Sequence, residues 1–170
     1  AEKLGDSVDK ITILVMGGSQ GARGINEAII KMLAISDELV GRIQILHLAG
    51  QTDFEIVETN YKRLKFQSLV VPFSSEMEYF YSLADLVVAR SGASSLNETA
   101  HYGLPSFLIP YPFAADDHQT LNARIFEQVG AAKIFTQDKL TAEGLKSAVV
   151  ELLEDSDARE LMSKSAKELA

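Results

Sequence analysis

Two polar segments, residues 90–98 (RSGASSLNE) and 116–123 (DDHQTLNA), carry the side chains best suited to chemistry in this chain. Each stands where an apolar stretch typical of a strand gives way to a helical pattern. A third segment, residues 17–22 (GGSQGA), follows another apolar stretch in the same way. A strand-to-helix junction presents free backbone N–H groups and the positive end of a helix dipole, which together favour a phosphate. Three such junctions on one sheet edge predict a cleft for a sugar nucleotide.

The turn after the first apolar stretch is rich in glycine, and its missing Cβ atoms let a ligand approach the backbone closely. Ser19 can add a hydroxyl donor. The turn does not fit the dinucleotide fingerprint G-x-G-x-x-G, because Met16 occupies the first glycine's place relative to Gly18 and Gly21, and it lacks the P-loop lysine. A tight connection whose glycines serve the turn alone explains the segment equally well. Arg23, in the first helical turn, could face a phosphate, but an exposed arginine at this position is more often solvated.

Glu98 is the candidate ligand of a ribose. Gly92 and Ala93 would expose amides, while Ser94 or Ser95 would cap the helix that leads to Glu98. A carboxylate accepts two hydrogen bonds, and vicinal ribose hydroxyls offer two donors at the matching separation. The alternative is structural, because Ser95 and Glu98 also fit a Ser-x-x-Glu capping box, and spacing alone favours the cap.

Carboxylate, imidazole and amide groups are concentrated in the segment that begins at Asp116. Asp116, Asp117, His118 and Gln119 suit a hydroxyl-rich sugar. A metal site is poorly supported, because two aspartates and one histidine lack further clustered ligands. A plain helix N-cap by one of the aspartates is the other alternative. His47 stands in an apolar stretch, and we expect it to be structural.

Short β-branched or aliphatic runs alternate with helical patterns, which predicts an α/β fold with a Rossmann-like parallel sheet and helices on both faces. The expected strands are residues 11–16, 43–48, 69–71, 86–89, 106–109 and 133–135. The expected helices are residues 24–34, 53–62, 75–83, 94–102, 118–129, 142–153 and 157–169. Open α/β sheets bind ligands outside the carboxyl ends of their strands, so the three polar segments should share that edge.

Composition narrows the classes of function. The 170 residues are 46% hydrophobic, which suits one domain with a substantial core. A net charge of −8 argues against a surface for nucleic acid or anionic membrane. The absence of cysteine excludes disulfides and thiolate metal sites, and cytoplasm is the expected location. The sequence has neither an apolar run that crosses a bilayer nor a secretory signal. The missing initiator Met and a helical pattern that runs to Ala170 predict a fragment of a longer protein.

Taken together, these segments and Gly103-Leu104-Pro105 resemble the donor-binding half of the MurG family. These bacterial N-acetylglucosaminyltransferases add GlcNAc from UDP-GlcNAc to the lipid-linked muramoyl-pentapeptide, converting lipid I to lipid II in peptidoglycan synthesis. The similarity runs from about Ile11 to Ala170. It implies that residues 1–170 are the C-terminal UDP-sugar-binding domain of a two-domain GT-B enzyme. An N-terminal domain absent from this chain would hold the lipid acceptor and the general base.

The resemblance also implies inverting transfer, no tightly bound cofactor or metal, and peripheral contact with the cytoplasmic face of the plasma membrane in the full-length protein. By this match Ser19 and the neighbouring turn amides bind the diphosphate, and Glu98 binds the ribose hydroxyls. His118 and Gln119 would contact GlcNAc, and the backbone at Phe73 would recognise uracil. The full predicted set of substrate-binding residues is Gly18, Ser19, Gln20, Gly21, Phe73, Ser74, Arg90, Gly92, Ala93, Ser94, Ser95, Glu98, His118 and Gln119.

Two other functions fit the same residues. A glycolipid synthase that uses UDP-glucose or UDP-galactose with a diacylglycerol acceptor has a similar donor half, and replacement of the sugar contacts at His118 and Gln119 would mark it. A non-catalytic sugar-nucleotide-binding module that acts with a partner chain also fits. A dinucleotide oxidoreductase is disfavoured, because it needs a different glycine spacing and a ribose-binding acid after the second strand.

Overall fold

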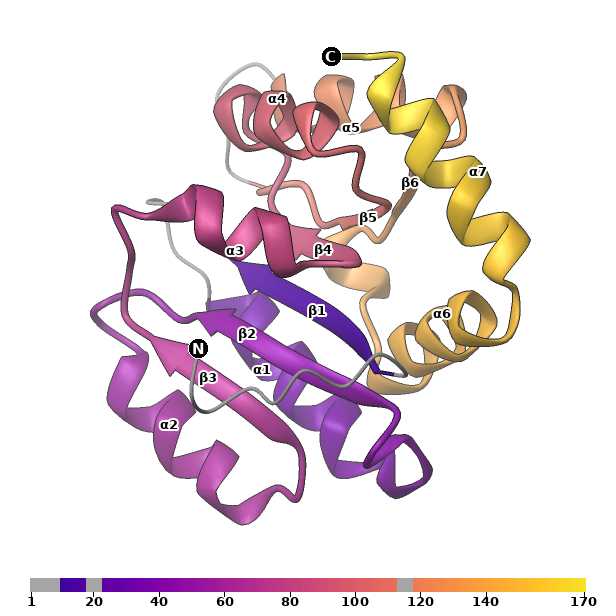
Figure 1. Ribbon diagram of the computed structural model, residues 1–170. Coiled ribbons are helices and arrows are strands. Elements are labelled where there is room, and N and C mark those ends of the chain that lie inside the picture. The colour runs from indigo at the N-terminus through magenta and orange to yellow at the C-terminus, as the bar shows by residue number, and fades with distance from the viewer. Residues whose placement is uncertain (1–9, 18–22, 113–117) are drawn as a thin grey trace.

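The computed structural model describes residues 10–17, 23–112 and 118–170. Within these ranges the strands form one six-stranded sheet in the order β3-β2-β1-β4-β5-β6, and every neighbouring pair is parallel. The strands are β1 (Ile11–Met16), β2 (Ile43–Leu48), β3 (Gln67–Val71), β4 (Leu86–Ala89), β5 (Ser106–Leu108) and β6 (Ala132–Ile134). This arrangement confirms the predicted Rossmann-like parallel sheet (Figure 1).

Helices connect the strands in the described part of the chain. They are α1 (Arg23–Ala34), α2 (Phe54–Arg63), α3 (Met77–Leu83), α4 (Ala93–His101), α5 (His118–Gln128), α6 (Ala142–Glu154) and α7 (Ser156–Lys167). Two short 3₁₀ helices, Asp37–Leu39 and Gln137–Lys139, were not predicted. The remaining elements agree with the sequence prediction to within two residues at each end.

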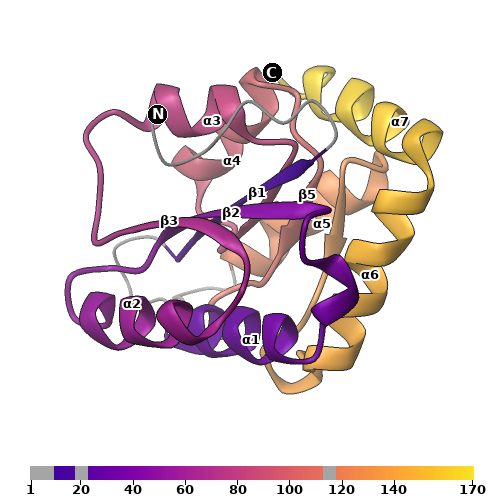
Figure 2. The same ribbon diagram turned by 60° about the horizontal axis from the view of Figure 1, so that its bottom comes forward.

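Alternating side chains of each strand supply two apolar layers. In β1, Ile13 and Val15 pack with α1, α2 and α6, whereas Leu14 and Met16 pack on the opposite face with α3. Helices α4, α5 and α7 share a third cluster on that second face. Figure 2 shows α1 and α2 on one side of the sheet and α3 and α4 on the other. Burial on both faces explains the near-continuous apolar runs from which the strands were predicted.

The strand order reverses at the centre of the sheet. From β1 the chain proceeds outward to β2 and β3, and then returns so that β4 pairs with the other side of β1. The connections after β1 and β4 therefore diverge, which opens a crevice at the carboxyl edge of the sheet. The glycine-rich segment begins at this reversal point, directly after Met16.

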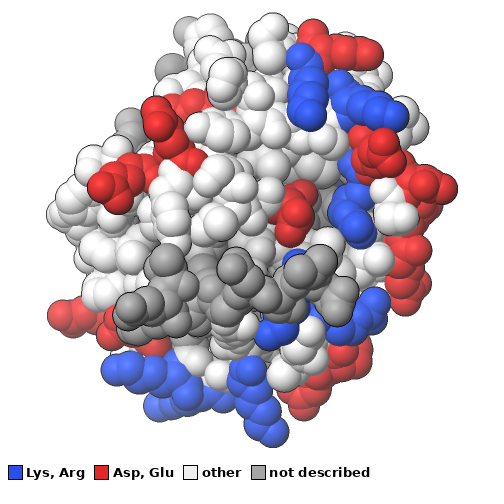
Figure 3. Space-filling model, viewed as in Figure 1, with Lys and Arg blue, Asp and Glu red and all other residues white. Residues whose placement is uncertain are grey.

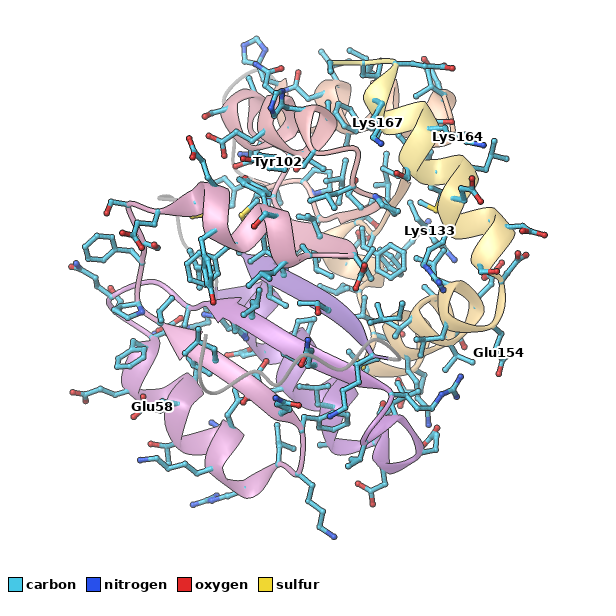
Figure 4. All side chains as sticks on the ribbon, in the orientation of Figure 1. Glu58, Tyr102, Lys133, Glu154, Lys164 and Lys167 are labelled. Carbon is cyan, nitrogen blue, oxygen red and sulfur yellow. The ribbon has the colours of Figure 1, made fainter. Side chains whose placement is uncertain are left out.

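Helix α4 ends at His101, one residue before the predicted end at residue 102, and Gly103 follows its C-cap residue. Gly103 has φ +63°, and its N–H donates to the Ala100 carbonyl at 2.9 Å, which closes the helix in a left-handed turn. The side chain of Lys167 lies against this glycine, so α7 packs over the end of α4; Figure 4 labels Lys167 on α7 and the adjacent Tyr102. The positive φ, rather than this contact with a flexible side chain, explains why the corner favours glycine.

Charged residues of both signs are interspersed on the surface. On the face shown in Figure 3, Lys and Arg lie beside Asp and Glu along α7, where Glu160 and Lys164 form an i,i+4 ion pair at 3.2 Å. Within the described ranges no helix combines the length and apolar character needed to cross a bilayer.

Candidate functional site

A cavity of about 990 Å³ opens at the carboxyl edge of the sheet. Its walls come from the end of β1, the loops after β2 and β3, and helices α3 and α4. The lining residues are Met16, Gly17, Arg23, Leu48, Ala49, Gly50, Gln51, Thr52, Asp53, Pro72, Phe73, Ser74, Met77, Tyr81, Ser94, Ser95 and Glu98. Segments that are up to about eighty residues apart in sequence thus meet at the position where a parallel α/β sheet binds its ligands.

Five of the predicted substrate-binding residues line this cavity: Phe73, Ser74, Ser94, Ser95 and Glu98. Phe73 is 62% exposed although it is a large apolar side chain, and it lines the cavity two residues after the end of β3. An exposed ring at a cavity mouth provides a flat apolar surface that a planar base can cover. The structure therefore brings the predicted base-binding and ribose-binding positions into one space.

The start of α4 differs from the prediction. Gly92, with extended φ and ψ of −67° and 147°, is the N-cap residue, and no side chain caps the helix. Ser94 and Ser95 lie inside the first turn, so the predicted serine cap and the Ser95–Glu98 capping box do not form. Without a side-chain cap, the first N–H groups of α4 have no intrahelical partner and point to the edge where Ser94 and Ser95 line the cavity. Glu98, in the second turn, is free of the capping role.

Tyr81 is a neighbour of Glu98 in the cavity wall. Its side chain is 2% exposed, its hydroxyl lies 3.6 Å from Met16 Sδ, and its ring stacks on Tyr102 with centroids 5.4 Å apart. Burial, and then the neighbouring Glu98 carboxylate, raise the pKa of the Tyr81 hydroxyl. The hydroxyl therefore keeps its proton, which it shares between Met16 Sδ and the neighbouring Glu98 carboxylate.

Arg23 is not simply solvated, as the sequence had suggested. Its Nη2 donates to Asp53 Oδ1 at 2.9 Å, although 71% of its side chain is exposed, against 11% for Asp53. This ion pair lowers the pKa of Asp53, so the aspartate remains charged. Arg23 begins α1 directly after the glycine-rich segment, and both partners line the cavity. The pair places a guanidinium in the cavity wall, at the first residue of α1.

Arg90 and Gln119, which were predicted to bind the substrate, do not line the cavity. Arg90 is 7% exposed, and its Nη1 donates to the Ile109 carbonyl at 3.2 Å and to Gln137 Oε1 at 2.8 Å. Gln119 Oε1 accepts the N–H of Tyr111 at 2.8 Å, and the Arg90 guanidinium stands 5.4 Å above the Tyr111 ring. Both side chains thus hold the backbone that follows β5. Gly92, Ala93 and His118 also fall outside the cavity lining.

Ser91 joins two of the polar segments, a role that the sequence analysis missed. Its hydroxyl donates to the Gln119 carbonyl at 2.6 Å, and its own carbonyl accepts from Asn122 Nδ2 at 3.1 Å. The junction after β4 is therefore fastened to the start of α5. The Arg-Ser-Gly and His-Gln-x-x-Asn residues meet in space, as the sheet-edge argument predicted.

The other predicted ligands, Gly18, Ser19, Gln20 and Gly21, lie outside the described residues, as do Asp116 and Asp117. Across the described ranges no group of three or more His, Asp or Glu side chains could hold a metal ion.

Residues 12–170 match the family described as the glycosyltransferase family 28 C-terminal domain. A curated relative from Desulfotalea psychrophila is 38% identical over 171 residues, which cover 100% of this chain and 46% of the relative. A relative from Thermodesulfovibrio yellowstonii is 42% identical over 154 residues, which cover 90% of this chain and 42% of the relative. Both carry the name UDP-N-acetylglucosamine–N-acetylmuramyl-(pentapeptide) pyrophosphoryl-undecaprenol N-acetylglucosamine transferase. The chain thus spans less than half the length of these relatives.

Solved structures show the same arrangement. A crystal structure of Acinetobacter baumannii MurG superposes with a TM-score of 0.86 at 32% identity, over 98% of this chain and 50% of that chain. The structure of S. aureus MnaA with UDP has a TM-score of 0.69 at 12% identity, over 92% of this chain and 41% of that chain, and it supports the fold alone.

Proposed function

We propose, on the premise that this chain belongs to the family of glycosyltransferase family 28 C-terminal domains, that its carboxyl-edge cavity binds UDP-GlcNAc as a glycosyl donor. The full-length enzyme would transfer GlcNAc with inversion to a lipid-linked muramoyl-pentapeptide, the substrate pair in the names of its relatives. One observation carries the proposal. Glu98, the uncapped start of α4 and the exposed ring of Phe73 converge on one cavity at the point where the strand order reverses.

Each part of UDP-GlcNAc has a matching group. The Glu98 carboxylate can accept hydrogen bonds from two vicinal ribose hydroxyls, and the first N–H groups of α4 favour phosphate oxygens. Phe73 offers an exposed apolar face that suits uracil. The glycine-rich turn enters the cavity at Gly17, and its remaining residues are assigned to the diphosphate by the family resemblance.

The chemistry requires further groups. The acceptor hydroxyl must lose a proton as it attacks the anomeric carbon, and the departing diphosphate must be stabilised. Backbone amides and the start of α4 support the leaving group, with no tightly bound cofactor or metal in the proposal. We expect the general base, the lipid acceptor site and a peripheral contact with the cytoplasmic membrane face in the N-terminal domain of the full-length protein.

Calorimetric titration tests the proposal. We expect the chain to bind UDP-GlcNAc in preference to UDP-glucose and UDP-galactose, and to bind all three better than an adenine nucleotide. The Glu98→Gln variant keeps the side-chain shape and removes the charge. Because hydrogen bonds to charged groups contribute about 1.5–3 kcal/mol, its affinity for UDP should fall by about 10- to 100-fold.

Glu58→Gln on α2 is the matched control, because Glu58 is a surface carboxylate paired only with Lys62 at 3.7 Å and does not line the cavity. A folded Glu98→Gln variant with unchanged affinity for UDP would refute the ribose assignment. Absence of any preference for uridine nucleotides in the wild-type chain would refute the proposed function as a whole.

A further inference from the structure

Three buried polar side chains that have no role in the proposed function are joined by hydrogen bonds. Asn26 of α1, His47 of β2 and Tyr61 of α2 are 2%, 0% and 5% exposed. His47 Nε2 lies 2.7 Å from Asn26 Oδ1, and His47 Nδ1 lies 2.8 Å from the Tyr61 hydroxyl. Polar groups buried this deeply cost free energy unless all of them are satisfied, so their arrangement needs an explanation.

The direction of each hydrogen bond follows from the last link. Asn26 Nδ2 donates to the Ala49 carbonyl at 3.0 Å, which leaves Asn26 Oδ1 as an acceptor. His47 must therefore donate from Nε2, and its unprotonated Nδ1 accepts from the Tyr61 hydroxyl. Burial lowers the pKa of His47 to about 3 and raises that of Tyr61, so both remain neutral and the chain of donors is fixed.

This series of hydrogen bonds ends at the Ala49 carbonyl, in the loop that lines the cavity. The Ala49 N–H donates to the Val71 carbonyl at 2.9 Å, and the Gly50 N–H donates to the Pro72 carbonyl at 2.9 Å. Residue Ala49 is thus held from α1 through its carbonyl and from the end of β3 through its N–H. Phe73 follows Pro72 directly.

Asn26 also lies one helical turn after Arg23, the first residue of α1, which is itself paired with Asp53 of the same rim loop. Helix α1 begins at Arg23, which lines the cavity, and the proposed function assigns the preceding turn to the diphosphate, so this side is the diphosphate end of the proposed site. The loop after β3 is the base end. The buried residues therefore connect the helix that follows the phosphate turn to the segment that faces the base.

We propose that Asn26, His47 and Tyr61 form a positioning network that sets the separation between the diphosphate end and the base end of the nucleotide cavity. The inference rests on the proposed function and deepens it. None of the three side chains touches the ligand, and all act through the Ala49 carbonyl and the rim loop.

The affinity of a ligand that spans both ends should depend on this separation, whereas the affinity of a ligand that occupies one end should not. UDP is the spanning probe, and uridine and inorganic pyrophosphate are the two one-ended probes. We expect Asn26→Ala to weaken UDP binding by about tenfold, within the range for coupled neighbours, and to change uridine and pyrophosphate binding by less than about threefold. A simple loss of stability would change the competent fraction alike for all three probes.

The affinities are measured by NMR titration of the 170-residue chain. Ser36→Ala is the control, because Ser36 is also fully buried and donates to the Met32 carbonyl at 2.5 Å, just beyond the other end of α1. It should lower the melting temperature without changing the ratio of UDP to uridine affinity. An Asn26→Ala variant that loses UDP and uridine affinity by the same factor, or retains UDP affinity, overturns the inference and leaves the proposed function intact. A wild-type chain that binds no UDP overturns both.

Two further measurements keep the inference testable if Asn26→Ala does not fold. Tyr61→Phe removes only the outermost hydroxyl and should lower UDP affinity relative to uridine by about two- to threefold, at the small end of coupling effects. An unchanged ratio counts against the network. In the wild-type chain, ¹⁵N NMR should show His47 protonated at Nε2 alone. Protonation at Nδ1 would require Asn26 to donate to His47 Nε2, which would leave the Asn26 oxygen facing the Ala49 carbonyl, and would overturn the assignment.

Discussion

At the scale of single residues, Tyr81 is expected to orient the carboxylate that we assign to the ribose. Tyr81→Phe removes the buried hydroxyl beside Glu98 and keeps the ring that stacks on Tyr102. A net hydrogen bond of about 0.5–1.5 kcal/mol corresponds to about 2- to 12-fold weaker UDP binding. Binding of 2′-deoxy-UDP should change much less, because that ligand lacks one of the hydroxyls that the carboxylate accepts from.

Calorimetry with both nucleotides gives this comparison. Tyr79→Phe is the control, since Tyr79 stands on the same helix and does not line the cavity. If Tyr81→Phe weakens UDP and 2′-deoxy-UDP by equal factors, Tyr81 acts on the cavity as a whole rather than on the ribose.

His47 should make the stability of the protein depend on pH. Its folded pKa of about 3 lies below its ordinary 6.5, because burial disfavours the charged ring. Below pH 6.5 the unfolded chain therefore binds a proton that the folded chain excludes. The stabilisation is fully present above pH 6.5 and falls, by up to about 1.4 kcal/mol per pH unit, as the pH decreases toward 3. Urea unfolding between pH 7 and 4.5 measures this slope.

The His47→Gln variant should have a flatter slope over that interval, whereas His101→Gln, which changes an exposed histidine of α4, should match the wild type. Asp53 loses stabilisation in the same direction at lower pH, because its folded pKa is depressed, and it is present in all three proteins. Equal slopes for wild type and His47→Gln would show that His47 is not held neutral by burial.

At the scale of elements, the sequence predicted β1, β2 and β4 to the residue, because buried parallel strands are apolar runs bounded by turn residues. It missed the polar start of β3, where Gln67 and Ser68 extend the pairing with β2. It also began α3 two residues early. There the Ser74 hydroxyl accepts the N–H of Glu76 at 3.0 Å, a local turn that competes with the helix.

The residues of the candidate site also fall into two groups, those that the sequence indicated and those that it did not. Glu98 was a candidate because it follows a recognisable strand and the Arg-Ser-Gly segment, although spacing alone favoured a capping role, and Phe73 was implied by the family resemblance alone. The Arg23–Asp53 pair joins residues 30 apart, and Tyr81 meets Glu98 only because α3 and α4 pack on the same face of the sheet. Contacts of this kind depend on strand order and helix packing, which local sequence patterns do not contain. The N-cap at Gly92 was missed because two nearby serines offered a better local signal.

At the scale of the whole molecule, the strand order makes the cavity depend on the entire fold, so a bound ligand should stabilise the whole folded chain. The cavity is lined by segments between Met16 and Glu98 that belong to both faces of the sheet. Unfolding of either layer would destroy the site, so a nucleotide should stabilise the folded chain as one unit. At 100 times its dissociation constant, UDP-GlcNAc should raise the free energy of unfolding by about 2.7 kcal/mol.

For a domain of this size, that stabilisation corresponds to an increase of about 5–10 °C in the melting temperature, which calorimetric or fluorescence melting can follow. Sodium chloride at equal ionic strength separates specific binding from a general effect of added salt on a chain of net charge −8. The Glu98→Gln variant, melted at the same UDP-GlcNAc concentration, should gain less, because the stabilisation depends on occupancy. If it gains as much as the wild type, the stabilising ligand does not occupy the cavity that Glu98 lines, and the coupling between this site and the fold must be assigned elsewhere.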